Sequence, residues 1–325
     1  MNEKQEGLIH ACRLSGDGNQ QRLDWGGIDN WSNEQGPLWI HLDYTSEESI
    51  RWLREKSYLD PLVIDALLAD ETRPRCAVMG GGLLVNLRGV NSNPNSNPED
   101  MVSIRLFCDG QRFISTRKRR LLSIQDIISR LDQGTGPKNP GELLSMLTHR
   151  LTDRMSEIVS ELDDAVDNVE EQIIATAGIS HRSRLVELRR QIIMLRRYLS
   201  PQREALTRLL SELAPWLDER DRLGIREAGD RVSRYLEDLD SCRDRAAVAY
   251  EELASRTAEQ MNSRMYVLSI VAALFLPLGF ITGLFGINVG GIPFADDPGG
   301  FIELGLILVV IVVLQIVIFR FKNWF

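Results

Sequence analysis

The residues with the clearest chemical potential are Gly286-Ile287-Asn288, which end a long stretch without charged side chains. If a helix ends at Gly286, its last carbonyls have no partner within the helix, and the Asn288 side chain adds another carbonyl oxygen. Neutral oxygens can accept hydrogen bonds from the water around a divalent cation, and such ions lose that water reluctantly. Alternatively, Asn288 only caps the helix, because asparagine tolerates a left-handed turn. Residue types alone leave both interpretations open.

The element that ends in these residues is apolar enough to cross a bilayer. No charged side chain occurs from Met265 to Ala295, and one helical span needs about 20 apolar residues. A second apolar stretch, Phe301–Phe319, is broken only by Glu303 near its start and Gln315 inside it. The sequence therefore predicts a membrane hairpin over residues 265–325, with spans at about 265–286 and 301–319.

Steps of three and four residues along the first span give one face of small and apolar side chains. Small residues let helix backbones approach closely around an axis, and an apolar constriction can gate a pore by dewetting. Met265 and Leu268 are the candidates for such a gate. Alanine and glycine also serve ordinary helix packing, so that plainer interpretation stays open. The face consists of Met265, Leu268, Ala272, Leu276, Gly279 and Gly283.

The same face continues before the span as a line of carboxylates. No proline occurs between Pro215 and Pro277, so one helix of about 60 residues, 226–285, can run into the membrane and reach about 90 Å. A helix of that length needs neighbours to hold it. The carboxylates would attract cations in a funnel, or they form a solvated face. They are Glu237, Asp240, Asp244 and Glu251.

The run Tyr266–Asn288 resembles the first span of the CorA superfamily of divalent-cation transporters. That family ends this helix in Gly-Met-Asn, where this chain has Gly-Ile-Asn. The isoleucine and the following run 289–293, Val-Gly-Gly-Ile-Pro, are similar to the zinc-transporting ZntB branch. Magnesium-type members carry a glutamate after the proline, and this chain has Phe294 there. The resemblance extends to Glu71–Arg75 and Leu195–Arg203 and covers most of the chain.

The resemblance implies a homopentamer that moves divalent cations, most simply Zn²⁺, with the ion as substrate and no cofactor. Two helices cannot enclose a pore, so a ring of subunits is required in any case. The first span would line the pore, the second would face lipid, and Gly286, Ile287 and Asn288 would form the filter around a hydrated cation. The branch couples transport to protons. Neither span core contains an ionisable residue, so a proton relay would need acids at the mouth or in the funnel.

Charges around the spans predict the orientation. Arg256 and Arg264 precede the first span, and Arg320 and Lys322 follow the second. Positive flanks stay inside, and the N-terminus lacks a signal-peptide pattern. We therefore expect a bacterial inner-membrane protein with both termini in the cytoplasm and the Gly-Ile-Asn loop outside. In that loop, Asp296 and Asp297 either concentrate cations at an outer mouth or form a solvated turn.

Composition bounds the remaining classes of function. The net charge of −8 argues against nucleic acid as a partner. The four cysteines and four histidines are scattered, so neither a disulfide framework nor a tight zinc cage is indicated. No nucleophile–base pair or nucleotide loop stands out, so we expect no enzyme. The alternatives are a magnesium-type CorA channel and a membrane-tethered coiled-coil scaffold or sensor.

The residues before the spans predict an α/β domain followed by a helical stalk. Residues 1–140 form the α/β domain. Within it, the pattern of Gly80-Gly81-Gly82 predicts a turn between two strands rather than a phosphate-binding loop. Short helices are expected at 46–55, with a capped start, 61–69 and 123–131. Strands are expected at 8–14, 38–42, 77–79, 83–87, 102–107 and 113–115.

The stalk, residues 141–264, follows the Gly- and Pro-rich linker 134–141. A helix at 142–177 carries an acid stripe that we interpret as solvated, with regulatory cation binding as the alternative. Helices at 181–199 and 202–213 are separated by a kink or a new helix start near Pro201. Three arginines of this region are expected to pair structurally with acids: Arg196, Arg197 and Arg203.

Overall fold

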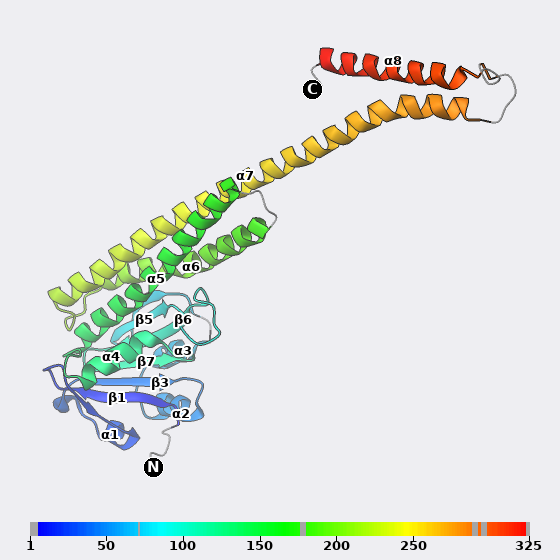
Figure 1. Cartoon of the computed structure of the whole chain (residues 1–325). Helices are drawn as coiled ribbons and strands as arrows, with labels where there is room; N and C mark the ends of the chain where they lie inside the picture. Colours follow the sequence, from blue (N-terminus) through cyan, green and yellow to red (C-terminus); the bar gives the residue numbers. More distant parts are fainter. Residues whose placement is uncertain (1–5, 71, 176–179, 288–291, 294–297, 323–325) are drawn as a thin grey trace. The chain divides into compact units, whose positions relative to one another are not determined.

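The computed structural model describes residues 6–70, 72–175, 180–287, 292–293 and 298–322. It confirms the predicted class, an N-terminal α/β domain followed by long helices and two apolar C-terminal helices (Figure 1). The chain forms two compact units, Met1–Tyr250 and Glu251–Phe325.

The first unit is built on a seven-stranded sheet of order β2-β1-β3-β7-β6-β5-β4. Neighbouring strands are antiparallel except β3 and β7, which are parallel. The six predicted strands are all present, but β2 was missed because it is a short, polar edge strand. The strands are β1 Leu8–Leu14, β2 Gln20–Arg22, β3 Leu38–Asp43, β4 Arg75–Met79, β5 Gly82–Gly89, β6 Val102–Cys108 and β7 Arg112–Arg117.

Helices cover both faces of the sheet. Successive side chains of a strand point to opposite faces, so neighbouring residues in a strand pack against different helices. Leu84 and Phe107 face α2 and α3 and belong to the main apolar core. Gly89 lies on the other face, where a Cβ atom would come within 2.6 Å of Leu151 and 2.8 Å of Leu121. The short helices are α1 Trp25–Asp29, α2 Glu47–Glu55, α3 Pro61–Leu68, α4 Leu122–Asp132 and the 3-10 turn η1 Asn33–Gln35.

Local details both confirm and correct the sequence expectations. Gly80 and Gly81, with φ values of 58° and 78°, form the predicted turn between β4 and β5, and both left-handed values suit a tight hairpin. Ser46 occupies the N-cap of α2, but its side chain makes no capping hydrogen bond. α1 and η1 were not predicted, because segments of 5 and 3 residues are too short to show helical periodicity.

Three long helices follow the sheet: α5 Pro140–Ala175, α6 Ser180–Ser211 and α7 Glu219–Phe285. A new helix start near Pro201 is excluded, because α6 continues through this residue; the alternative, a kink at Pro201, stays a prediction. α7 approaches α5 closely at Gly224, where an added Cβ atom would overlap Ser145 Oγ. Arg231 also pairs with Asp153 at 2.6 Å. The long helix is therefore held against its neighbour by a glycine contact and an ion pair.

Asp221, in the first turn of α7, is buried against Gly141, and its Oδ2 atom has no hydrogen-bond partner among the described residues. Burial, reinforced by the nearby Asp218 carboxylate, raises the pKa of Asp221 to about 6. A raised carboxyl pKa favours folding in the protonated form, so this contribution is complete below the unfolded pKa near 4 and is lost as the pH rises through 6.

Asp221→Asn is therefore expected to raise the stability of the protein at pH 7.5 by about 1–2 kcal/mol, because the amide cannot ionise. The advantage should shrink towards pH 4.5. The measurement is the thermal unfolding midpoint of purified protein in detergent at pH 4.5, 6.0 and 7.5. If the difference in unfolding midpoint between the variant and the wild type is the same at all three pH values, Asp221 is not a buried carboxylate that ionises in this range.

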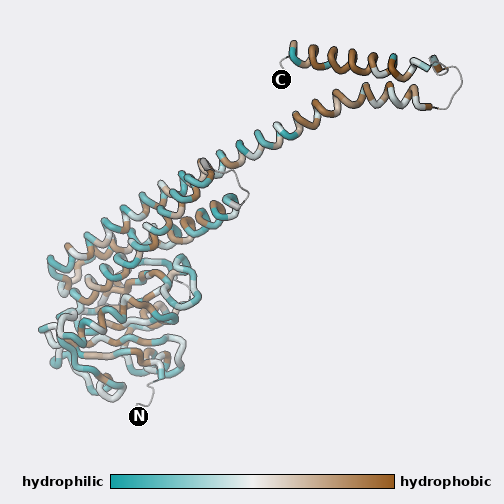
Figure 2. Tube along the Cα trace, viewed as in Figure 1, coloured by the Kyte–Doolittle hydropathy of each residue, from teal (hydrophilic) through white to brown (hydrophobic). Residues whose placement is uncertain are grey.

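The second unit contains the end of α7 and the helix α8, Gly300–Phe321. Among the described residues these two helices are long and apolar enough to cross a membrane. Figure 2 shows the apolar residues concentrated on α8 and the C-terminal part of α7. α8 was predicted at 301–319 and extends slightly beyond both ends.

Candidate functional site

The six residues predicted to line a pore lie on one uncovered face of α7. Met265, Leu268 and Leu276 are 63%, 69% and 70% exposed in the single chain, and Ala272 is also exposed. A Cβ atom added at Gly279 or Gly283 would meet nothing within 4 Å. The single chain thus presents a continuous strip of small and apolar residues without a neighbour.

α8 lies against the opposite side of α7. Ile270, Leu274, Leu278 and Ile281 are partly buried. At about 100° per residue, these side chains point roughly 180° away from the uncovered strip. α8 therefore packs on one face of the first span and leaves the strip free.

A polar contact between the two spans was missed from sequence. Pro277 lies inside α7 and has no N–H to donate to the carbonyl of Ala273, four residues earlier. The side chain of Gln315 in α8 donates a hydrogen bond from Nε2 to that carbonyl at 3.4 Å. Two features of the sequence could have predicted this hydrogen bond: a proline inside the first span and a single polar residue inside the second. A proline leaves a backbone carbonyl without its helical partner, and inside a membrane such a group needs another hydrogen-bond donor.

The segment that follows α7 is described only as far as Ile287 and at residues 292–293 and 298–299. The helix ends at Phe285, and the Gly286 N–H donates a hydrogen bond to the Gly283 carbonyl at 3.1 Å. Gly286 and Ile287 are both exposed. Asn288 of the predicted filter, and Asp296 and Asp297 of the predicted mouth, lie outside the described residues. Their roles stay predictions.

The carboxylates predicted for the funnel are partly neutralised by arginines. Asp240 pairs with Arg196 of α6 and lies 3.1 Å from Arg243. Arg243 also pairs with Asp244 at 2.8 Å. The pairing expected for Arg196 is thus confirmed. Glu237 and Glu251, the latter in the second unit, are exposed.

The acid stripe predicted on α5 is exposed along its length, as its solvated interpretation expects, and among the described residues only its Asp167 has an ion pair. The stripe consists of Glu157, Glu161, Asp164, Asp167 and Glu171. Arg245 of α7 contacts three α5 carboxylates: Asp163 at 2.9 Å, Glu170 at 2.5 Å, and Asp167. These charge-assisted contacts raise the pKa of Arg245 above its ordinary value, with Glu170 and Asp167 as the main causes. The cluster joins two helices and thus gives Asp167, together with Asp163 and Glu170 beside the stripe, a structural role.

In the described ranges, no group of three or more histidine, cysteine or acidic residues is arranged to hold a metal ion. All four cysteines are free and buried. Burial raises the pKa of the Cys12 thiol to about 12 and lowers the pKa of the His10 imidazole to about 4. These groups are therefore neutral near pH 7, as protonated thiol and neutral ring.

Comparison with known proteins identifies relatives along nearly the whole chain. "Divalent cation transporter CmaX" of Pseudomonas aeruginosa is 41% identical over 325 residues, covering 98% of this chain and 97% of the relative. "Zinc transport protein ZntB" of Yersinia enterocolitica is 38% identical over 304 residues, covering 94% and 92%. A solved structure of full-length CmaX has a TM-score of 0.87 at 40% identity, with 100% of both chains covered.

A family model also matches, and its span includes strands β3 to β7 of the sheet and the two apolar helices. It is described as "CorA-like Mg2+ transporter protein", and it matches residues 34–323. The match and the relatives agree with the resemblance carried by the Gly-Ile-Asn ending. The chain therefore belongs to the CorA-like family of transporter proteins.

Proposed function

We propose that this protein is a homopentameric transporter of divalent cations, with Zn²⁺ as its main substrate, and that the first apolar helix lines its pore. The observation that carries the proposal is the uncovered strip on α7. A Cβ atom at either of its glycines would meet nothing within 4 Å, while α8 occupies the opposite side. A ring of subunits brings five such strips together around one axis and gives them neighbours.

Support for zinc comes from the relatives and from the resemblance of the Gly-Ile-Asn segment to the zinc-transporting branch. One relative carries the name zinc transport protein and another the name divalent cation transporter. Gly286-Ile287 precedes Asn288, and Phe294 stands where magnesium-type members have a glutamate. A ring of neutral oxygens suits a hydrated divalent cation in general, so the choice of zinc rests on the relatives and the resemblance.

The proposed path runs from an outer mouth to a cytoplasmic funnel. Asp296 and Asp297 raise the local cation concentration, and Asn288 with the Gly286 carbonyl holds the hydrated ion. Met265 and Leu268 form the apolar gate. Glu237 and Glu251, which are exposed, attract the ion below, more strongly than the arginine-paired Asp240 and Asp244.

The proposed setting is the bacterial inner membrane with both termini in the cytoplasm, because the basic residues flank the outer ends of the hairpin. α8 faces lipid. A proton relay in this protein uses acids outside the spans, since the described span cores contain no ionisable side chain.

Zinc flux into vesicles tests this function. Wild-type protein in liposomes is expected to carry labelled Zn²⁺ above the rate of empty vesicles, and Asn288→Ala is expected to lower that flux at least about tenfold by removing the filter carbonyl. Asn262→Ala is the matched control, since Asn262 is an exposed asparagine of α7 before the span.

Unchanged flux in Asn288→Ala would rule out the filter assignment. Flux of Mg²⁺ without Zn²⁺ would replace the zinc assignment by a magnesium-type channel. If no divalent ion is transported and the protein is a monomer or dimer in detergent, the hairpin only anchors a scaffold or sensor in the membrane.

A further inference from the structure

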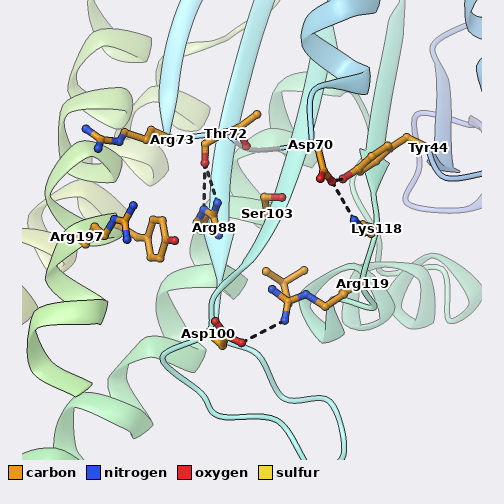
Figure 3. Close-up of a pocket in the computed structure, with 12 residues that line it drawn as sticks. Tyr44, Asp70, Thr72, Arg73, Arg88, Asp100, Ser103, Lys118, Arg119 and Arg197 are labelled. Atoms are coloured by element: carbon orange, nitrogen blue, oxygen red, sulfur yellow. Dashed lines mark hydrogen bonds and ion pairs between the residues drawn. The ribbon is translucent and has the colours of Figure 1, made fainter. Parts of the chain in front are cut away.

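A cavity of about 660 Å³ in the first unit is lined mainly by charged and polar residues. It lies where β5 and β7 end and β6 begins, between the segment after α3 and the helix α6 (Figure 3). Five basic side chains line it: Arg73, Arg88, Lys118, Arg119 and Arg197. The transport path proposed above uses none of them.

Two of these cations have a carboxylate partner. Lys118 pairs with Asp70 at 3.0 Å, and Arg119 lies 3.7 Å from Asp100 (Figure 3). Arg73, Arg88 and Arg197 have no carboxylate partner among the described residues; Glu71, beside Arg73 in sequence, is not among those residues. The described lining thus carries a local excess of three positive charges.

Arg88 is held in a fixed position at the centre of this lining. Its guanidinium donates to the Thr72 carbonyl at 2.8 Å and the Met101 carbonyl at 2.8 Å, and it lies 4.0 Å from the Tyr198 ring centroid. A further donation from Nε to Thr72 is 3.3 Å long. These three bonds leave two of its five N–H groups for a ligand. The cation is therefore preorganised, and its partners are neutral.

A second buried cation stands behind the cavity wall. Arg105 is fully buried, and its Nη2 atom donates to the Asp70 carbonyl at 2.9 Å. Its guanidinium lies 4.4 Å from the ring centroid of Tyr44, a lining residue. Burial lowers the pKa of both Arg88 and Arg105 from the ordinary arginine value. An anion in the cavity would compensate part of that unfavourable burial.

The two short motifs of the soluble part meet at this place. Thr72 and Arg73 belong to the Glu71–Arg75 motif, and Arg197 and Tyr198 belong to Leu195–Arg203. Gln202 of the second motif also accepts a hydrogen bond from the Arg88 backbone N–H at 2.7 Å. Arg197 was expected to pair with an acid, but its contact in the structure is the Tyr198 ring at 5.7 Å.

We propose that this cavity binds a small molecule bearing two or more linked phosphates. Arginine forks match phosphate oxygens in bidentate geometry, and Arg73, Arg88 and Arg197 line the cavity from three different segments of the chain. The volume is in the range of small-molecule sites and exceeds what one phosphate fills. The inference does not depend on which ion the protein transports.

Calorimetric titration of full-length protein in detergent tests the site, with inorganic phosphate, pyrophosphate and ATP as probes in EDTA at low salt. Pyrophosphate and ATP are expected to bind saturably, and phosphate at least about tenfold more weakly. The double substitution Arg73→Gln, Arg197→Gln is expected to weaken ATP binding at least about tenfold. Both residues are exposed, so their replacement leaves the Arg88 contacts in place.

Arg75→Gln with Arg189→Gln is the matched control, because these exposed arginines lie on β4 and α6 and do not line the cavity. Its affinity should stay within about twofold of wild type. Tighter binding of ATP than of pyrophosphate would assign a role to the nucleoside, and equal binding would assign recognition to the phosphates alone. No saturable binding of either probe, or equal loss in the control, would overturn the proposal.

Discussion

Gly279→Leu is expected to lower divalent-cation flux at least about tenfold, because a leucine at this position would enter the shared axis of the ring. In the single chain nothing lies within 4 Å of a Cβ atom at Gly279, so the hairpin itself has room for the change. Gly279→Ala adds one methyl group and should give an intermediate loss. The measurement is initial Zn²⁺ uptake into proteoliposomes at equal protein content.

Gly305→Leu in α8 is the control for this substitution. A Cβ atom at Gly305 also meets nothing within 4 Å, and we place this face of α8 against lipid, where leucine is favourable. Its flux should remain within about twofold of wild type. Equal tolerance of both substitutions would contradict the assignment of α7 to the pore. Equal loss would show that both glycines face other subunits.

Leu268→Ser is expected to raise basal cation flux about three- to tenfold, because a hydroxyl in an apolar constriction lets water remain there. Leu268 is 69% exposed in the single chain and lies on the uncovered strip. Val267→Ser is the matched control, since Val267 is 58% exposed and its side chain points about 100° away around the helix. Uptake without an imposed gradient of pH or voltage is the relevant measurement.

The two serine variants also separate gating from general damage. Serine can bond to a carbonyl one turn earlier and changes an exposed helix position little. An increase for both variants would indicate a leak from destabilised packing, and a decrease for Leu268→Ser alone would remove that residue from the gate.

Sequence patterns predicted the elements that have a clear period or a clear boundary. The absence of charge over 265–295 predicted the first span, and short apolar stretches between Gly, Pro and Asn breaks predicted the strands. Helix α7 was expected from about residue 226 and begins at Glu219, within the same uninterrupted run after Pro215. These signals are local, so one sequence suffices to detect them.

Features that depend on contacts between distant residues were not predictable in the same way. α6 continues through Pro201 because packing against its neighbours outweighs one lost hydrogen bond. The bond from Gln315 to Ala273 joins positions 42 residues apart. The arginines paired with Asp240 and Asp244 lie on the same helix and on α6, so the acids alone gave an incomplete account of the charge there.

The chemistry of the candidate pore stays a prediction, and its residues are only partly located in the structure. The strip from Met265 to Gly283 lies on one face and is uncovered. Asn288 is outside the described residues. The sequence pattern did not reveal the basic cavity around Arg88, because its cations come from one strand, two connecting segments and a helix.

The most direct test is an electron-microscopy map of the full-length protein in lipid nanodiscs with zinc. Five subunits should surround one axis, with the α7 strip lining a continuous aqueous path and the Asn288 side chains directed at a hydrated ion at its outer end. A monomer or dimer, a dry axis lined by α8, or asparagine side chains directed into lipid would contradict the transport account.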